Sequence, residues 1–198
     1  MKSIKKITGL LMSLLLFVGI FAGCGNSGSS GAAAGNASKL EEIKKRGTVR
    51  IGVFSDKPPF GYVDSNGKNQ GYDVYIAKRI AKDLLGDENK VEFVLVEAAS
   101  RVEFLQSDKV DIILANFTVT DERKEVVDFA NPYMKVALGV VSKDGAIKSV
   151  DDLKGKKLLV NKGTTAETYF TENYPDIELL KFDQNTETFE ALKDGRGD

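Results

Sequence analysis

The sequence lacks histidine and tryptophan and contains a single cysteine among 198 residues. Without histidine, Cys24 alone cannot complete a nitrogen–sulfur ligand set for structural zinc, or a serine–histidine or cysteine–histidine nucleophile system. It also has no partner for an internal disulfide, so stability must come from packing. The 28 basic and 29 acidic side chains leave a net charge of −1, which provides no basic field for nucleic acid. We therefore expect no metal, no cofactor and no nucleic-acid partner.

The first residues have the pattern of an export signal. Three lysines among the first six residues precede an apolar run from Leu10 to Ala22, which is too short to span a bilayer. Small residues then lead directly into Cys24, and this resembles a bacterial lipobox, which implies that Cys24 is lipidated. The alternative is ordinary signal-peptidase cleavage, with Cys24 left as a stray thiol. We expect residues 1–23 to be a lipoprotein signal peptide and residues 24–38, rich in glycine and serine, to be a flexible tether.

Segments typical of strands and helices alternate through the next part of the chain. Asp73 is placed to cap a helix, and Ser100 and Glu103 have capping-box spacing for another. The order strand, helix, strand predicts an α/β architecture with a parallel, doubly wound sheet. The predicted elements are a helix at 40–46, strands at 48–54, 91–96 and 110–114, and helices at 73–85 and from Ser100.

The same alternation restarts after Tyr133. We therefore expect two lobes, lobe 1 at residues 39–135 and lobe 2 at residues 136–198. A further strand is expected after the last helix, but the sequence ends at Asp198, so we expect lobe 2 to be incomplete. The predicted elements of lobe 2 are strands at 136–141, 157–160 and 177–182, and helices at 164–173 and 186–193.

Ligands of open α/β sheets bind beyond the carboxyl ends of the strands, and the segment 115–123 has this position. It leaves a buried strand and enters a short helix. Asn116 and Thr118 offer hydrogen-bonding groups, and Arg123 has a planar fork that can hold a carboxylate through two parallel bonds. The alternative is structural: Thr120 caps the helix, and Arg123 pairs with Asp121 or Asp128.

A second segment of this kind follows the strand at 157–160. Thr164 and Glu167 have capping-box spacing, and Gly163 allows close approach of the backbone. Free N–H groups at the start of the following helix favour an anion. The alternative is that Thr164 is only a cap and Thr165 only a first-turn residue.

Several motifs in order resemble those of the extracytoplasmic solute-binding proteins of polar-amino-acid ABC transporters, family 3. The resemblance covers residues 40 to 198. Within the family it is greatest for the cysteine-binding lipoproteins, through the stretches 54–63 and 115–118. The motifs are Gly47–Val53, Pro58–Tyr62, Gly71–Val74, Thr118–Arg123, Asp128–Tyr133, Leu153–Lys157 and Gly163–Thr165.

The resemblance implies a periplasmic-binding-protein type II fold, with two doubly wound sheets joined by a hinge, that closes on one free amino acid and delivers it to a membrane permease. It implies that Arg123 clamps the ligand carboxylate with help from Thr164 and Thr165. It also implies that Asn116 and Thr118 help to hold the ammonium group or the side chain. The acidic partner of the ammonium group in this family lies beyond Asp198.

Two positions depart from relatives in ways that bear on the ligand. Relatives that bind acidic amino acids have Lys at the position of Phe54, although Arg101 matches their second arginine, and a stacking aromatic is replaced by Lys57. A small, weakly polar ligand such as cysteine therefore fits better than aspartate or glutamate, and cystine and glutamine stay open. The three aromatics Phe60, Tyr62 and Tyr133 are either pocket walls or core.

The resemblance favours a monomeric, membrane-anchored protein outside the cytoplasm that is not an enzyme. The alternatives are a periplasmic dehydratase-like enzyme and a sensor domain on the same fold. A dehydratase needs a general acid or base near Arg123, and without histidine that role would fall to a carboxylate.

Overall fold

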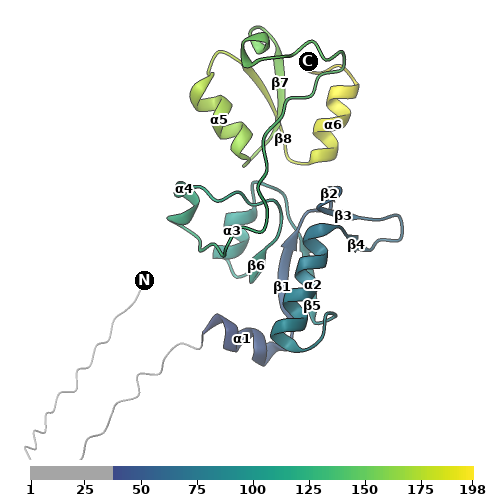
Figure 1. The fold of residues 1–198 in the computed structure, drawn as a ribbon, viewed down its shortest axis with the longest axis vertical. Helices are drawn as coiled ribbons and strands as arrows, with labels where there is room; N and C mark the ends of the chain where they lie inside the picture. Colours follow the sequence, from purple (N-terminus) through teal and green to yellow (C-terminus); the bar gives the residue numbers. More distant parts are fainter. Residues whose placement is uncertain (1–37) are drawn as a thin grey trace, which may run out of the picture. The chain divides into compact units, whose positions relative to one another are not determined.

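The computed structural model describes residues 38–198, drawn as a ribbon in Figure 1. The predictions for the signal peptide at 1–23, for Cys24 and for nearly all of the tether at 24–38 lie outside the described residues. We call residues 39–135 lobe 1 and residues 136–198 lobe 2. The elements are α1 (Lys39–Arg46), β1 (Val49–Val53), β2 (Asp56–Lys57), β3 (Gly61–Val63), β4 (Asn69–Gln70), α2 (Tyr72–Leu85), β5 (Val91–Leu95), α3 (Arg101–Gln106), β6 (Ile112–Ile113), α4 (Asp121–Lys124), η1 (Val150–Leu153), β7 (Lys157–Asn161), α5 (Thr165–Asn173), β8 (Glu178–Phe182) and α6 (Asn185–Lys193).

The main sheet of lobe 1 has the strand order β5-β1-β6, and both pairings are parallel. Ile51 in the central strand pairs with Phe93 on one side and Ile112 on the other. The apolar side chains of β1, Val49, Ile51 and Val53, are buried, as expected for a parallel strand with both faces covered. Helix α2 packs beside β1 and contributes buried Val74, Ala77 and Ala81. The predicted parallel α/β sheet is confirmed.

A small antiparallel sheet of β2, β3 and β4 lies in the stretch that the sequence analysis treated only as turns. Gly61 in β3 has no room for a side chain, because an added Cβ would lie 2.9 Å from the carbonyl oxygen of Phe54. This close packing places Asp56 and Lys57 on a strand rather than in a free loop.

Asp73 is not the N-cap of α2, contrary to the prediction. The N-cap is Gly71 at φ 111°, and a Cβ there would lie 2.2 Å from the oxygen of Phe60. The backbone N–H groups of Tyr72 and Asp73 donate to the carbonyls of Pro59 and Phe60, so the helix start is capped by backbone. The carboxylate of Asp73 is therefore free for another partner.

The predicted capping box at Ser100 is also wrong. Ser100 has a helical backbone conformation, and its hydroxyl donates to the carbonyl of Glu97 instead of accepting from the helix. Glu103 pairs with Lys109 at 3.3 Å. The competing local turn, a common use of serine hydroxyls, takes the side chain away from the helix start.

Lobe 2 contains a two-stranded parallel sheet of β7 and β8, with Leu159 beside Leu180. Helices α5 and α6 flank the two strands (Figure 1). The core consists of buried Leu153, Phe170 and Ile177 with partly buried neighbours. The predicted strand, helix, strand, helix order of this lobe is confirmed from β7 onwards.

The predicted strand at 136–141 is wrong, because residues 134–142 are irregular. Its apolar side chains are exposed, to 63% at Leu138 and 75% at Val141. A strand needs a neighbour for its backbone hydrogen bonds, and none of the strands among residues 38–198 pairs with this run. The local preference for extended backbone is present, but the ladder that would fix it is not.

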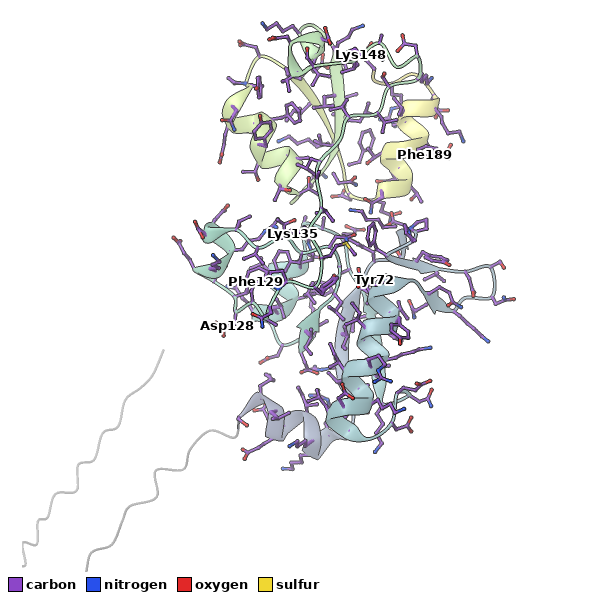
Figure 2. All side chains as sticks on the ribbon, viewed as in Figure 1. Tyr72, Asp128, Phe129, Lys135, Lys148 and Phe189 are labelled. Carbon is purple, nitrogen blue, oxygen red and sulfur yellow. The ribbon has the colours of Figure 1, made fainter. Side chains whose placement is uncertain are left out.

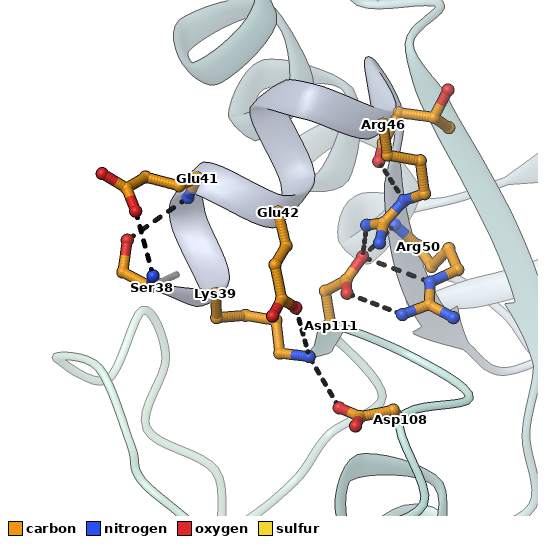
Figure 3. Close-up of polar contacts among 9 residues, drawn as sticks. Ser38, Lys39, Glu41, Glu42, Arg46, Arg50, Asp108 and Asp111 are labelled. Atoms are coloured by element: carbon orange, nitrogen blue, oxygen red, sulfur yellow. Dashed lines mark hydrogen bonds and ion pairs between the residues drawn. The ribbon is translucent and has the colours of Figure 1, made fainter. Parts of the chain in front are cut away.

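Three side chains join α1, β1 and the loop before β6 (Figure 3). The carboxylate of Asp111 is fully buried, accepts from Arg50 Nη2 at 2.9 Å and from the Arg50 backbone N–H at 2.8 Å, and pairs with Arg46. Burial raises the pKa of Asp111, but the hydrogen bonds and charges of the two arginines outweigh this and hold the pKa below its usual value. Asp111 and the two arginines thus hold α1 against the main sheet of lobe 1.

Candidate functional site

Arg123 projects from a short helix that is held by its own cap. Thr120 is the N-cap of α4 and accepts from the Arg123 N–H at 3.2 Å, which confirms this part of the structural alternative. The alternative pairing of Arg123 with Asp121 is wrong, because Lys124 takes Asp121 at 2.9 Å. The Arg123 guanidinium instead donates to the carbonyl of Thr118 at 2.8 Å and to the carbonyl of Gly163 in lobe 2 at 2.9 Å.

Arg101 lies near Arg123, but its guanidinium group is buried and bound by backbone carbonyls. Its side chain is buried, with 3% of the residue exposed. It donates to four carbonyls, those of Ala98, Ala115, Asn116 and Gly163, at 2.8 to 3.2 Å. Burial, followed by the nearby charge of Arg123, lowers the pKa of Arg101 to about 9. Arg101 therefore has little donor capacity left for a ligand.

Aromatic rings line the two guanidinium groups. Phe117 lies 4.7 Å from the guanidinium carbon of Arg101 and 4.7 Å from that of Arg123. On its other contacts Phe117 packs against Phe129, labelled in Figure 2, with ring centroids 5.2 Å apart. These cation–π contacts hold both arginines in fixed positions without neutralising their charge.

The start of α5 meets this group from lobe 2. Thr164 is the N-cap and accepts from the Glu167 N–H at 3.3 Å. The Glu167 carboxylate accepts from the N–H of Gly163 at 2.7 Å rather than from that of Thr164, so only half of the expected capping box forms. Gly163 has φ 69°, and a Cβ there would lie 2.5 Å from the Cα of Ala99. Glycine is thus required at the point where the backbones of the two lobes approach.

The predicted site residues are distributed around this contact. Arg123 and Thr165 line a cavity of about 270 Å³, together with Tyr169 and residues around them. Phe54, Asp56 and Asp183 are among the residues that line a second cavity of about 230 Å³. Phe54 itself is only 3% exposed and packs in the core with Val96, Ala98 and Ala115.

Asn116 and Thr118 contribute differently from the expectation. Asn116 has a positive φ of 43°, and its buried Oδ1 has no hydrogen-bond partner among the described residues. Thr118 is exposed, and its contact with Arg123 is through the carbonyl rather than the hydroxyl. The Asn116 oxygen is thus one of the buried acceptors in this part of the chain that have no partner.

A second polar pair adjoins the site and was missed by the sequence analysis. Tyr133 donates its hydroxyl to Asp73 at 2.9 Å and packs against Tyr72, labelled in Figure 2. Asp73 is fully buried, and burial, opposed by the Tyr133 hydrogen bond, raises its pKa. Burial also raises the pKa of Tyr133 and lowers that of Lys57. The only signal in the sequence was an acidic residue on the apolar face of a helix.

Among residues 38–198, no group of three or more acidic or cysteine side chains could hold a metal ion. No helix in this part of the chain has the length and apolar character needed to cross a membrane.

With this geometry established, the sequence and fold can be compared with known proteins. Residues 49–195 match the profile of the family described as bacterial extracellular solute-binding proteins, family 3. The chain is 41% identical over 199 residues to the glutamine-binding protein GlnH of an ABC transporter of Bacillus subtilis, a match that spans 98% of this chain and 73% of that protein.

Two solved structures of cysteine-binding proteins are similar in fold and sequence. The protein from Campylobacter jejuni superposes with a TM-score of 0.79 at 72% identity, covering 80% of this chain and 64% of that one. The L-cysteine receptor of Neisseria gonorrhoeae gives a TM-score of 0.78 at 68% identity, covering 80% and 65%. The chain thus spans slightly less than two thirds of these two structures.

Proposed function

The chain belongs to family 3 of the bacterial extracellular solute-binding proteins, and on that premise we propose that it is the substrate-binding component of an amino-acid ABC transporter. Its fold is the periplasmic-binding-protein type II fold of the solved relatives. In the proposed role it captures one free polar amino acid outside the cytoplasm and delivers it to the permease subunits.

The observation that carries this proposal is the convergence of Arg123 on a carbonyl of the other lobe. Two of its N–H groups are held by the oxygens of Thr118 and Gly163. A ligand carboxylate can replace the Gly163 oxygen and make a stronger, charge-assisted bond with the same fork. Thr164 and Thr165, at the adjoining helix start, supply backbone N–H donors for the second carboxylate oxygen. Thr165 also supplies its hydroxyl, whereas the Thr164 hydroxyl already donates to the carbonyl of Asn161 at 2.7 Å.

The ligand in this proposal carries a single carboxylate. A second carboxylate would require the second arginine, but Arg101 keeps the carbonyls of Ala98, Ala115 and Asn116 in its own lobe even when the Gly163 oxygen is displaced. The ligand ammonium group or side chain faces Asn116 and Thr118, where the unpartnered Asn116 Oδ1 is the available acceptor. The Phe54 ring closes the base of this region from the core.

Cysteine is the amino acid that we propose. It is small enough for a site without an additional charged partner, and the solved cysteine-binding relatives are 72% and 68% identical to this chain, against 41% for the glutamine-binding relative. Glutamine and cystine are the competitors. A dehydratase-like enzyme is the alternative of another class, for which turnover of a prephenate-like substrate is the test.

The proposed location follows from the family and the first residues. We propose that the protein acts outside the cytoplasm as a monomer, and that Cys24 carries a lipid anchor beyond a signal peptide at 1–23. Replacement of Cys24 by Ala tests the anchor: the variant should leave the membrane fraction after a carbonate wash, and equal retention would contradict lipidation.

Isothermal titration against all twenty amino acids and L-cystine, in the presence and absence of a reductant, tests the ligand. We expect one binding isotherm with L-cysteine under reducing conditions and no heat with aspartate or glutamate. Tight binding of glutamate would contradict the single-carboxylate argument, and binding of glutamine in preference to cysteine would correct the ligand but not the function.

A further inference from the structure

Helix α6 does not satisfy its whole first turn by itself. The N-cap of α6 is Gln184, which forms a capping box with Glu187. The Glu187 carboxylate accepts from the Gln184 N–H at 3.3 Å, and the Gln184 side chain faces the Glu187 N–H. The capping box provides no acceptor for the N–H of Thr186, another amide of the first turn.

That acceptor comes from the other lobe. Asp56, on strand β2 of lobe 1, accepts from the side-chain amide of Asn185 at 2.9 Å through one oxygen. Its other oxygen accepts from the backbone N–H of Thr186 at 3.2 Å. A carboxylate at a helix N-terminus also interacts favourably with the helix dipole. Asp56 thus has the position and the chemistry of an N-cap but belongs to a different part of the chain.

We propose that Asp56 is an inter-lobe cap: it stabilises the arrangement in which the two lobes touch and thereby raises the affinity for the ligand. When the lobes separate, the first turn of α6 loses its acceptor and Asp56 loses two donors. The contact is therefore made in one arrangement only, which is the condition for a residue to shift the population between two.

The effect on affinity rests on the proposed function. If only the closed arrangement holds ligand tightly, the apparent dissociation constant is the intrinsic one divided by the closed fraction. Removal of the cap lowers that fraction without touching the ligand. Asp56 is accordingly a positioning residue, distinct from Arg123.

Two further acidic residues, Glu97 of lobe 1 and Asp183 of lobe 2, line the same cavity as Asp56. Asp183 in lobe 2 is paired with Lys162 at 2.9 Å, which compensates its charge. Asp183 therefore provides a control: Asp183→Asn removes the same charge from the same cavity without removing a bond between the lobes.

Hydrogen exchange of the Thr186 amide, measured by NMR in the ligand-free protein, tests the cap directly. Asp56→Ala should speed this exchange about fivefold to thirtyfold, the loss expected of a helix cap, while the amides in the middle of α6 and the Asp183→Asn control change little. The double variant Asp56→Asn with Asn185→Asp reverses the side-chain donor and acceptor and should restore slow hydrogen exchange. An unchanged hydrogen-exchange rate in Asp56→Ala, or a rate that stays fast in the double variant, would overturn the inter-lobe cap.

Titration with L-cysteine and L-glutamine then tests the effect on affinity. Asp56→Ala should weaken the binding of whichever amino acid binds by about fivefold to thirtyfold, the same factor as the exchange, and the reversed pair should recover it. Faster exchange with unchanged affinity would overturn the role in affinity. If neither amino acid binds the unaltered protein, their role as ligands fails, and the exchange measurement still decides whether Asp56 is the cap.

Discussion

The two lobes contribute to the candidate site in different ways. Lobe 1 provides charged side chains, Arg101, Arg123 and Asp56, held by aromatic packing and carbonyls. Lobe 2 provides mostly backbone: the Gly163 carbonyl and the first turns of α5 and α6. The difference extends to the cores, because β1 is buried at every position except Arg50, whereas β7 and β8 are largely half-exposed. In the proposed function, lobe 1 therefore recognises the ligand and lobe 2 closes against it.

The largest expected effect is on stability and separates the two cores. Ile51→Ala removes a fully buried side chain from the centre of the main sheet and should cost about 4 kcal/mol of unfolding free energy. Ile177→Ala, in the smaller core of lobe 2, should cost about 2 kcal/mol, because its half-exposed surroundings can rearrange. Urea denaturation measures both, and equal losses would contradict the difference between the cores.

The next effect concerns recognition by lobe 1. Arg123→Ala should weaken ligand binding by about 3 kcal/mol, since a desolvated charge pair is lost, and Arg123→Lys should recover little because lysine lacks the planar fork. The unfolding temperature without ligand should change little, because this side chain is half-buried at a helix end. Titration calorimetry and thermal melts check the two parts, and near-normal affinity of Arg123→Ala would refute the clamp.

Closure by lobe 2 can be broken at one glycine. Gly163→Ala introduces a Cβ 2.5 Å from the Cα of Ala99 in lobe 1, in addition to the cost of a positive φ. Gly155→Ala is the matched control: its φ is 72°, but nothing lies within 4 Å of the added carbon. We expect Gly163→Ala to lose about 2 kcal/mol of ligand affinity and Gly155→Ala almost none. Equal affinities by titration would place the closure elsewhere.

The smallest effect is a pH dependence confined to lobe 1. The pKa of Asp111 is depressed in the folded protein, so the pair with Arg46 and Arg50 stabilises the fold above the unfolded pKa of about 4. That stability is lost as the pH falls through the depressed value. Asp111→Asn should lower stability at pH 7 by about 1 kcal/mol and flatten the acid side of the stability curve. An acid slope identical to that of the unaltered protein would show that Asp111 does not titrate on unfolding.

The spacing of hydrophobic residues predicted most of the helices and strands, because hydrophobic periodicity is a local property of the sequence. The strand expected at 136–141 failed since strand formation depends on a partner. Asp73 was misplaced because its capping role is filled by backbone carbonyls of the turn between β2 and β3, in a small sheet that the turn-rich sequence did not reveal. The same limit applies to longer-range contacts.

Within the candidate site, Arg123, Thr164 and Thr165 were predicted from the chemistry of their types at strand ends, and the structure brings Arg123 and Thr165 to one cavity. Arg101 was taken as a ligand-binding residue, and only its contacts reveal that four carbonyls occupy it. Gly163 and Asp56 act across the lobes, between residues 40 to 130 positions apart in sequence. No spacing rule connects positions so distant.

The hydrogen bond between Tyr133 and Asp73 has a mechanical consequence. Tyr133 is the last aromatic residue before the chain leaves lobe 1, and its hydroxyl is tied to a buried group at the start of α2. If lobe 2 rotates about this part of the chain, the pivot therefore lies after residue 133. Residues 134–149 contain neither helix nor strand. From η1 onwards the chain is again structured. A small bend in the irregular stretch would therefore move the start of α5 and the start of α6 together.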